Sequence, residues 1–293
     1  MAGASHTTSA TGPVLIADPD SMRRAVLAAR GRGRRIGFAP TMGALHAGHV
    51  SLVDRAVADC DDVVVSIFVN PTQFGPGEDY GRYPRTLAAD LAALEGHGAT
   101  WIFTPDAGAM YPPGWATRIE VDGPARRFEG EVRPGHFTGV ATVVCRLFLA
   151  VPADIAYFGA KDWQQTLVVK RMVRDLGLPI DVMVCPTVRE PDGLAMSSRN
   201  AYLDREERHR ATALHESLRL AEQAWRAGDA VDGIERHMRL HLGSRGVAAD
   251  YAVIVDPESL EPLARPDAEA IALVAGRVGG TRLIDNLLLP PRG

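Results

Sequence analysis

The fold is decided by the stretch Phe38-Ala39-Pro40-Thr41-Met42-Gly43-Ala44-Leu45-His46-Ala47-Gly48-His49. Its apolar start predicts the end of a strand, and the apolar residues that recur at helical spacing from Val50 to Val57 predict a helix. The two histidines therefore lie where a strand passes into a helix, and Gly48 leaves room there for an anion. Taken alone, the string is more typical of a tight surface turn with two solvated histidines, so the rest of the chain has to decide.

Strands and helices alternate on both sides of this stretch. Strands are predicted at residues 14–16, 35–39, 62–69, 100–103, 154–158 and 179–186, and after two helical patterns at 251–255, 270–274 and 282–289. Segment 62–69 is almost entirely β-branched, as in a parallel strand buried on both faces. Residues 104–135 break the alternation, contain one strand-like piece at 118–121, and are interpreted as an insertion or lid. We expect an α/β fold with a doubly wound, Rossmann-like parallel sheet in residues 1–187 and a smaller C-terminal α+β domain in residues 188–293.

Composition narrows the class of protein. The 293 residues are 46% apolar and 23% charged, as in an ordinary soluble protein. The net charge of -4 argues against a nucleic-acid partner, and the arginines between 23 and 35 are interpreted as a solvated helix end. Cys60, Cys145 and Cys185 are too scattered for a disulfide framework or a zinc site, and are predicted to be buried thiols in a reducing compartment.

The chain also carries no sign of a membrane partner. Residues 1–12 are small and polar, and are predicted to form a disordered tail and not a signal peptide. No run reaches the roughly 18 consecutive apolar residues of a membrane span. We therefore expect a cytoplasmic protein.

Three further polar loops follow predicted strands. Asn70 and Gln73 follow strand 62–69 and are candidates for fixing a small polar substrate, although a plain surface loop fits about equally well. Lys161, with Asp162 and Gln165 beside it, follows strand 154–158, where a lysine can meet a phosphate and the aspartate can instead cap a helix. After strand 179–186, the serines and the arginine of 197–199 offer hydroxyls and a planar fork to phosphate oxygens, or they cap the helix that follows. Because parallel strands end at one edge of a sheet, the loops together predict an anion-binding edge.

The motifs resemble those of a known family. His46-Ala47-Gly48-His49 resembles the HIGH signature of the nucleotidylyltransferase and class I aminoacyl-tRNA synthetase superfamily, and Met196-Ser197-Ser198-Arg199 resembles its KMSKS-type loop. Longer strings in the same order are similar to the pantothenate synthetase family, namely residues 40–46, 68–74 and 83–85, Phe158-Gly159 with Lys161-Asp162, Gln164-Gln165, and residues 186–200. The resemblance is thinner after residue 200, and returns at Gly280-Thr281-Arg282-Leu283-Ile284-Asp285-Asn286.

The resemblance implies a sheet of the nucleotidylyltransferase type and an AMP-forming ligase. Such an enzyme uses ATP to join pantoate to β-alanine by a C–N bond, through a pantoyl adenylate. The family resemblance also implies a cytoplasmic homodimer, with magnesium held through the ATP phosphates and with no metal ligand assigned to the protein.

The same resemblance assigns the site residues. The implied ATP site consists of Met42, Gly43, Ala44, Leu45, His46, Ala47, Gly48, His49, Gly159, Ala160, Lys161, Asp162, Val188, Met196, Ser197, Ser198 and Arg199. The implied catalytic groups, which would meet the charge that develops on phosphate, are His46, His49, Lys161, Ser197, Ser198 and Arg199. Gln73 and Gln165 would bind pantoate, and Gln73 would also help to receive β-alanine.

Two departures and two alternatives qualify this interpretation. Ala160 stands where the family often has glutamate and Trp163 where it often has tyrosine, which puts a contact of the missing carboxylate in doubt.

One alternative is another adenylyl- or cytidylyltransferase acting on a phosphorylated acceptor, but Gln73 and Gln165 carry no charge to bind one. The other is a nucleotide-sensing or RNA-binding module without chemistry, which the intact histidines and lysine argue against.

Overall fold

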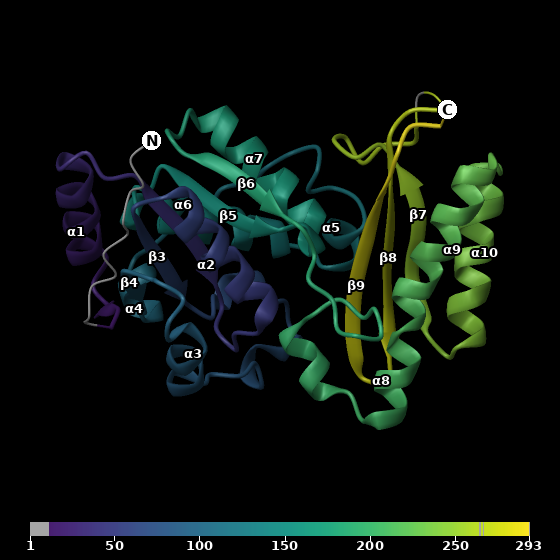
Figure 1. Ribbon diagram of the computed structural model, residues 1–293, viewed down its shortest axis with the longest axis horizontal. Helices are drawn as coiled ribbons and strands as arrows, with labels where there is room; N and C mark the ends of the chain where they lie inside the picture. The colour runs from purple at the N-terminus through teal and green to yellow at the C-terminus, as the bar shows by residue number, and fades with distance from the viewer. Residues whose placement is uncertain (1–11, 264, 266, 293) are drawn as a thin grey trace, which may run out of the picture. The chain divides into compact units, whose positions relative to one another are not determined.

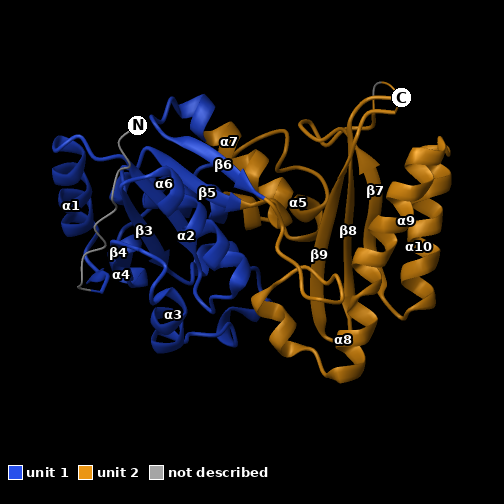
Figure 2. Cartoon of the chain, in the orientation of Figure 1, with its two compact units in different colours: residues 1–119, 139–158, 173–185 blue, residues 120–138, 159–172, 186–293 orange. Residues whose placement is uncertain are grey.

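The computed structural model describes residues 12–263, 265 and 267–292. Apart from Gly12, the predicted disordered tail of residues 1–12 lies outside the described residues. The chain divides into two compact units, which Figure 2 shows in different colours. The first comprises residues up to 119, 139–158 and 173–185, and the second comprises 120–138, 159–172 and 186–293. The domains 1–187 and 188–293 stay a prediction, because a unit defined by packing need not fold separately.

The first unit is built on a six-stranded sheet with the order β1-β4-β3-β2-β5-β6 (Figure 1). Its strands are β1 (Val14–Ile16), β2 (Ile36–Thr41), β3 (Asp62–Ile67), β4 (Trp101–Phe103), β5 (Ile155–Gly159) and β6 (Asp181–Cys185). β2 pairs in parallel with β3 on one side and with β5 on the other. From β2 the chain continues outward through β3 and β4, and from β5 it continues outward to β6. The strand order therefore reverses between β2 and β5, where an open parallel sheet collects its ligands.

Helices cover both faces of this sheet. α2 (Ala47–Asp59) packs Val53 and Ala56 in one core with Ala39 of β2. The ring of Phe148 in α6 (His136–Ala150) instead meets Phe38 of β2 edge-on, with 6.3 Å between centroids. Adjacent residues of a strand point to opposite faces, so α2 and α6 lie on opposite sides of β2. Further helices of this unit are α1 (Pro19–Gly31), α3 (Leu87–Leu94) and α4 (Ala107–Met110).

The second unit contains the antiparallel sheet β7 (Ala248–Val255), β8 (Ala270–Val278) and β9 (Thr281–Leu289). α9 (Ala213–Ala227) and α10 (Val231–Ser244) lie along it (Figure 1) and share a core with it that includes Trp225, Ala272 and Val274. Ile271 and Leu273, which alternate with those β8 residues, pack in a separate cluster on the other face. That second cluster also contains residues from the segment before α5 (Glu129–Val132) and from the start of α7 (Trp163–Leu176). α8 (Arg205–Ala211) precedes α9.

The predicted fold class is confirmed, and every strand predicted outside residues 104–135 is present. The strand predicted at 118–121 is wrong, because the amide of Ile119 donates to the hydroxyl of Thr142 (2.9 Å) and not to a neighbouring strand. The sequence Asp122-Gly123-Pro124 then turns the chain away from an extended course. Whether 104–135 acts as a lid stays a prediction.

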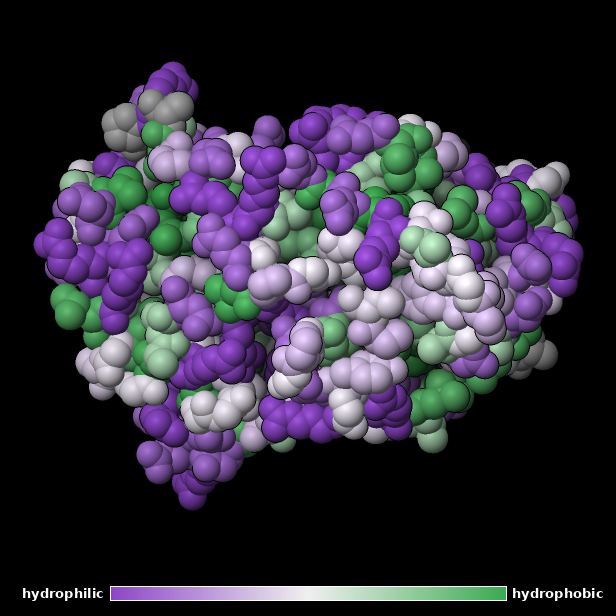
Figure 3. Space-filling view, turned by 180° about the vertical axis from the view of Figure 1, so that it is seen from behind, coloured by the Kyte–Doolittle hydropathy of each residue, from purple (hydrophilic) through white to green (hydrophobic). Residues whose placement is uncertain are grey.

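The structure confirms the prediction for the cysteines and refines the one for the arginine-rich segment. Cys60, Cys145 and Cys185 are buried free thiols, as predicted. In the arginine-rich segment, Arg30 pairs with Asp154 (2.9 Å) and Arg34 with Asp62, so these two side chains hold strand ends instead of only facing solvent. In the part of the chain that the structure describes, no helix is long and apolar enough to cross a membrane. Hydrophobic residues on the face in Figure 3 form separate patches among hydrophilic ones.

Candidate active site

The first part of the site is the turn between β2 and α2. The hydroxyl of Thr41 closes it by donating to the carbonyl of Ser66 (2.6 Å) and accepting from the amide of Gly43 (3.2 Å). Gly43 has a φ of 81°, and a Cβ there would lie 2.9 Å from a carboxylate oxygen of Asp90. Position 43 therefore favours glycine for both reasons. Ala44 also has a positive φ of 51°, a strained conformation of the kind that collects at functional sites.

Asp90 of α3 holds the backbone of this turn. The residue is 2% exposed, and its carboxylate accepts from the amides of Ala44 (3.1 Å) and Leu45 (2.8 Å). A charged acceptor on two backbone donors is a strong anchor. Sequence reasoning missed Asp90, whose only signal is an aspartate within an otherwise apolar helical stretch. Because these two amides are used inside the protein, an anion at the turn has to be met by other groups.

The rings of His46 and His49 lie together at the start of α2, with 4.1 Å between their centroids. His46 caps the helix, since its Nδ1 accepts from the amide of Gly48 (3.2 Å). Nδ1 therefore carries no proton, and in the neutral ring the proton lies on Nε2, which makes Nε2 a donor. Two imidazoles at the positive end of a helix suit a bound anion.

Gln73 lies in a buried hydrogen-bonded network. Its Oε1 accepts from Nδ2 of Asn70 (3.0 Å), and its Nε2 donates to the sulfur of Met42 (3.1 Å). Asn70 is 1% exposed and is itself fixed, because its Oδ1 accepts from the hydroxyl of Tyr111 (2.7 Å). Burial raises the pKa of Tyr111, so its hydroxyl keeps its proton at neutral pH. Asn70, a candidate substrate contact from the sequence, therefore orients Gln73.

A cavity of about 280 Å³ opens at the carboxyl ends of β2, β3 and β4. Its lining consists of Met42, Ile67, Phe68, Val69, Tyr80, Arg85, Thr86, Leu87, Asp90, Thr104, Pro105, Asp106 and Ala107. Met42 thus belongs both to the cavity wall and to the network of Gln73. This is the edge of the sheet at which ligand groups are expected.

In the second unit, the predicted lysine loop is the 3-10 turn Ala160–Asp162, directly after β5. The side chain of Lys161 is 19% exposed, and its Nζ lies 3.7 Å from Oδ1 of Asp162. The side-chain amide of Asn286 in β9 donates to the carbonyls of Ala160 (2.9 Å) and Lys161 (2.8 Å). The backbone around the lysine is therefore held from a strand more than a hundred residues away.

Two neighbouring glutamines at the start of α7 have different surroundings. Gln164 is buried, and its side-chain amide donates to the carbonyls of Pro124 and Arg127 (both 2.7 Å) and accepts from the backbone amide of Glu129 (3.1 Å). Gln165 is half-buried, and its side chain makes no hydrogen bond to another residue in the described ranges. The first is thus structural, whereas the second is available to a ligand.

The serine-arginine loop is also tied to β9. The guanidinium of Arg189 makes two hydrogen bonds to the carboxylate of Asp285 (2.6 and 3.0 Å). Ser197 caps the 3-10 helix Ser198–Tyr202 by accepting from the amide of Arg199 (3.3 Å). The interpretation of the serines as caps is therefore correct for Ser197. It leaves the hydroxyl proton of Ser197 for another acceptor.

Each unit gathers one part of the predicted site. In the first, the hydrogen bond from Gln73 to Met42 joins Gln73 to residues 42–49, while Asp90 holds the turn and Asn70 holds Gln73. In the second, a backbone hydrogen bond joins Met196 to Val188 (3.0 Å), and β9 holds both this loop and the lysine turn. Within the residues described, no group of three or more His, Cys, Asp or Glu side chains could hold a metal ion.

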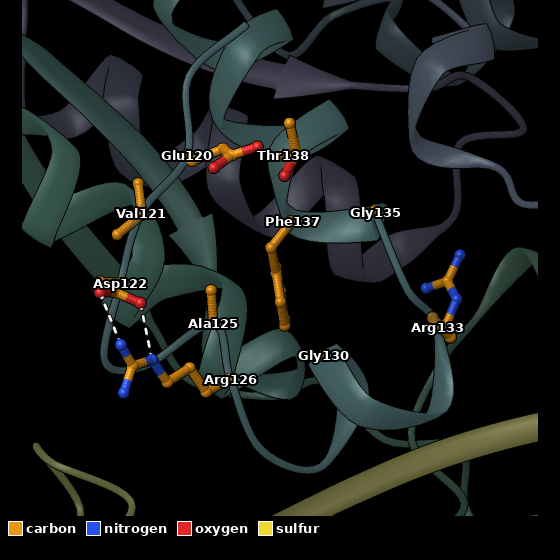
Figure 4. Close-up of a pocket in the computed structure, with 10 residues that line it drawn as sticks. All are labelled: Glu120, Val121, Asp122, Ala125, Arg126, Gly130, Arg133, Gly135, Phe137 and Thr138. Atoms are coloured by element: carbon orange, nitrogen blue, oxygen red, sulfur yellow. Dashed lines mark hydrogen bonds and ion pairs between the residues drawn. The ribbon is translucent and has the colours of Figure 1, made fainter.

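A second cavity, of about 400 Å³, lies within the second unit (Figure 4). It is lined by residues between Glu120 and Thr138, which include none of the predicted site residues. Figure 4 shows Phe137 pointing toward Gly130, and Arg126 paired with Asp122 (2.6 and 2.7 Å). This cavity is formed inside the segment that the sequence predicts to be an insertion.

Comparisons with known proteins decide the family. The model of the family described as pantoate-beta-alanine ligase matches residues 14–288. The chain belongs to the pantoate–β-alanine ligase family. A pantothenate synthetase from Roseiflexus castenholzii is 52% identical over 256 residues, which are 87% of this chain and 92% of that protein.

Solved pantoate–β-alanine ligases share the fold throughout. The crystal structure of pantothenate synthetase from Thermus thermophilus is 49% identical, with a TM-score of 0.90 over 95% of this chain and 100% of that one. A pantoate-beta-alanine ligase from Francisella tularensis, complexed with beta-gamma ATP and beta-alanine, is 33% identical, with a TM-score of 0.81 over 94% and 98%.

Membership of this family fixes the reaction. Pantoate–β-alanine ligases condense pantoate with β-alanine at the expense of ATP, through a pantoyl adenylate, and release AMP and pyrophosphate. The chain is therefore an enzyme that forms a C–N bond. The structure shows the surroundings of its two departures from the family pattern, while the loss of a carboxylate contact at position 160 stays a prediction. Trp163 donates its ring N–H to the carbonyl of Pro257 (2.8 Å), and the backbone carbonyl of Ala160 accepts from the side-chain amide of Asn286 (2.9 Å).

Proposed function

We propose that the chain makes pantothenate at the carboxyl ends of its parallel strands, with the residues predicted from the sequence. The carboxylate of pantoate attacks the α-phosphorus of ATP in line, and pyrophosphate leaves. The amine of β-alanine then attacks the acyl carbon of the adenylate, and AMP leaves. The observation that carries this proposal is the family match over residues 14–288, with the histidine turn directly after β2.

We assign ATP binding and phosphate chemistry to two groups of residues. One is the turn of residues 42–49, and the other comprises residues 159–162, Val188 and residues 196–199. Negative charge grows on the phosphate oxygens during the first step, and preorganised donors lower the free energy of that transition state. The capping bond to Nδ1 of His46 supports its role, because it places the proton of the neutral ring on Nε2 and so makes Nε2 a donor. The proposed donors are His46 and His49 in the first unit, and Lys161, Ser197, Ser198 and Arg199 in the second.

Pantoate is assigned to Gln73 and Gln165. Neutral amides can bind the hydroxyls and the carboxylate of a hydroxy acid, and they offer no charge that would favour a phosphorylated acceptor. The rigid network around Gln73 and the absence of an internal partner for Gln165, among the residues described, support these roles. Gln73 would also help to receive β-alanine. The second step depends mainly on holding the amine close to the adenylate.

We also propose magnesium, a homodimer and a cytoplasmic location. Magnesium, when bound to the phosphates, supplies positive charge to the oxygens of the leaving pyrophosphate. The imidazoles, lysine and hydroxyls of the assigned site are donors for phosphate oxygens and not a hard-cation cage, which fits an ion carried in by ATP. Buried reduced cysteines fit a reducing compartment. The homodimer rests on the family resemblance, and light scattering on the purified protein tests it.

A burst assay tests the proposed function. ATP and pantoate without β-alanine should release pyrophosphate only to the level of enzyme present, because the adenylate stays bound. Added β-alanine should then give continuous AMP and pantothenate. AMP formation that ignores pantoate would indicate another adenylyl- or cytidylyltransferase, and ATP binding without any turnover would indicate a non-catalytic module.

A further inference from the structure

The motif at residues 280–286 has no role in the proposed chemistry, yet three of its polar side chains each hold a different segment of the second unit. Arg282 donates to both carboxylate oxygens of Glu129 (2.6 and 2.7 Å). The other two, Asp285 and Asn286, hold the serine-arginine loop and the lysine turn. One strand, β9, therefore anchors segments 120–138, 186–200 and 159–162.

Asn286 acts on the two peptide groups that flank Lys161. A side-chain amide has two N–H donors, and both end on successive carbonyls, those of Ala160 and Lys161. One carbonyl belongs to the peptide plane before the Lys161 Cα and the other to the plane after it. Fixing both planes fixes φ and ψ of the lysine, and therefore the direction in which its side chain leaves the backbone. Asn286 is 7% exposed, so water has little access to replace these bonds.

Asp285 acts through Arg189 on the start of the other loop. The carboxylate is 3% exposed and is occupied by the guanidinium fork. Arg189 also donates to the carbonyls of Gly193 (3.1 Å) and Asn286 (3.3 Å). The backbone amide of Asn286 in turn donates to Oδ1 of Asp285 (2.8 Å). The two anchors are thus joined to each other as well as to their loops.

We propose that Asp285 and Asn286 are positioning residues for adenylate formation. Asn286 aims the ammonium group of Lys161, and Asp285 holds, through Arg189, the loop that carries Ser197 to Arg199. Because both anchors are neighbours on one strand, the two loops keep a constant spacing. This inference rests on the proposed function in one respect only, the assignment of Lys161 and the loop to ATP.

Two substitutions at position 286 test the first anchor. Asn286→Ala removes both donors, and Asn286→Asp keeps the shape but turns a carboxylate toward two carbonyls. We expect each to slow single-turnover, pantoate-dependent pyrophosphate release by about 10²-fold, the scale of a 1 Å misplacement. Aminolysis of supplied pantoyl adenylate by β-alanine should fall by less than about tenfold, since that step depends more on proximity than on charge.

A matched variant and a double variant separate positioning from folding. Leu289→Ala opens a cavity in the same strand, because Leu289 is fully buried in the core shared with α9 and α10, but it removes none of the hydrogen bonds to the lysine turn or to Arg189. It should lower thermal stability and leave both half-reactions of the folded protein unchanged. If Asn286 acts through Lys161, Asn286→Ala should add less than about twofold to the defect of Lys161→Ala. Equal losses in both half-reactions, or full additivity with Lys161→Ala, would overturn the proposal for Asn286.

The second anchor is tested with Arg189→Lys, which keeps the charge but loses the two-pronged contact. We expect adenylate formation to slow by about tenfold, with aminolysis changed much less. An unchanged rate of adenylate formation in the folded variant would remove Asp285 from the proposal. If Lys161→Ala itself left adenylate formation intact, the proposed function of that lysine would fail. Slow adenylate formation by Lys161→Ala, together with a normal rate for Asn286→Ala, would instead overturn this inference and leave the proposed function standing.

Discussion

The histidine turn of the first unit and the lysine turn of the second are anchored by opposite chemistry. In the first, the carboxylate of Asp90 accepts from two backbone amides, those of residues 44 and 45. In the second, the side-chain amide of Asn286 donates to the two carbonyls that flank Lys161. Each anchoring side chain is buried and comes from a part of the sequence that is distant from the turn it holds. In both turns the anchored backbone groups are satisfied internally, so the motif side chains are left to meet the ligand.

The two units differ in how much charge the anchors bury. Asp90 receives backbone donors, whereas β9 of the second unit uses full ion pairs, Arg282 with Glu129 and Asp285 with Arg189. Removing one partner of a buried pair leaves an uncompensated charge, which is costly. We therefore expect loss of the Arg282–Glu129 pair to cost mainly stability, and loss of the Asp90 anchor in the first unit to cost mainly rate.

The largest effect should come from Glu129→Ala. Glu129 is 6% exposed, and its carboxylate binds Arg282 and the hydroxyl of Tyr251 (2.8 Å). The variant leaves Arg282 buried beside Asp250 alone, and we expect the free energy of unfolding to fall by about 3–5 kcal/mol in urea titrations. The control is Glu261→Ala, whose carboxylate pairs with Arg127 (2.7 Å) but is 62% exposed. It should cost less than about 1 kcal/mol, and equal losses for the two variants would contradict the comparison.

The same pair gives a pH dependence of stability. Burial raises the pKa of Glu129, but the hydrogen bonds and charge of Arg282 outweigh burial and hold the pKa below its ordinary value. A carboxyl with a lowered folded pKa stabilises the protein above its unfolded pKa and loses that contribution as the pH falls through the folded value. The stability difference between the wild type and Glu129→Gln should therefore shrink below about pH 4.5, the ordinary pKa of glutamate. A constant difference from neutral pH down to strongly acidic pH would remove the ionised pair from the account.

In the first unit, the largest effect on rate should come from His49→Ala. Loss of one preorganised donor to the developing phosphate charge should slow adenylate formation by about 10²–10³-fold. Single-turnover release of pyrophosphate measures it. His97→Ala is the control, because His97 lies on the surface, where it contacts Asp54 (2.7 Å). Normal release by folded His49→Ala would remove His49 from the groups that meet the phosphate charge.

Asp90→Asn should have a smaller effect on rate. The amide keeps one acceptor for the turn but points an N–H group at the other backbone amide, so the histidine turn shifts. We expect adenylate formation to slow by about ten- to a hundredfold, with less loss of stability than Glu129→Ala causes. A large loss of stability with a normal rate for Asp90→Asn would contradict this expectation, because breaking an anchor would then have the same effect in both units.

Much of this fold follows from local sequence pattern. The β-branched run at 62–67 is typical of a buried parallel strand, and the apolar spacing after His49 predicted α2. The histidine turn, the lysine turn and the serine-arginine loop were placed after the correct strands for the same reason. Residues 118–121 misled the prediction, because an apolar alternation is present there but no neighbouring strand is available, and a helix hydroxyl takes the amide.

The anchors could not be predicted, because nothing local distinguishes them. Asp90 lies in a short helix, where its local sequence does not distinguish it from other helical aspartates. Its partner Leu45 is 45 residues earlier in the chain. Asn286 was named only as part of residues 280–286, which resemble the family. Its hydrogen bond to the carbonyl of Lys161 reaches back 125 residues. A side chain that serves a backbone so far away leaves no periodic signal, whereas the side chains that it positions form a compact motif.

The smallest effect should come from Gln73→Ala, and it tests whether the first unit also sets substrate preference. Loss of one neutral hydrogen bond to pantoate should raise the KM for pantoate by about three- to tenfold, with kcat changed less. Asn70→Ala should shift the pantoate KM in the same direction, because Asn70 holds the Gln73 amide through Oε1 (3.0 Å). Gln223→Ala, on the exposed side of α9, is the control and should change neither constant. If Gln73→Ala had a normal pantoate KM, pantoate recognition would belong to Gln165 and hence to the second unit. The first unit would then act on the phosphates alone.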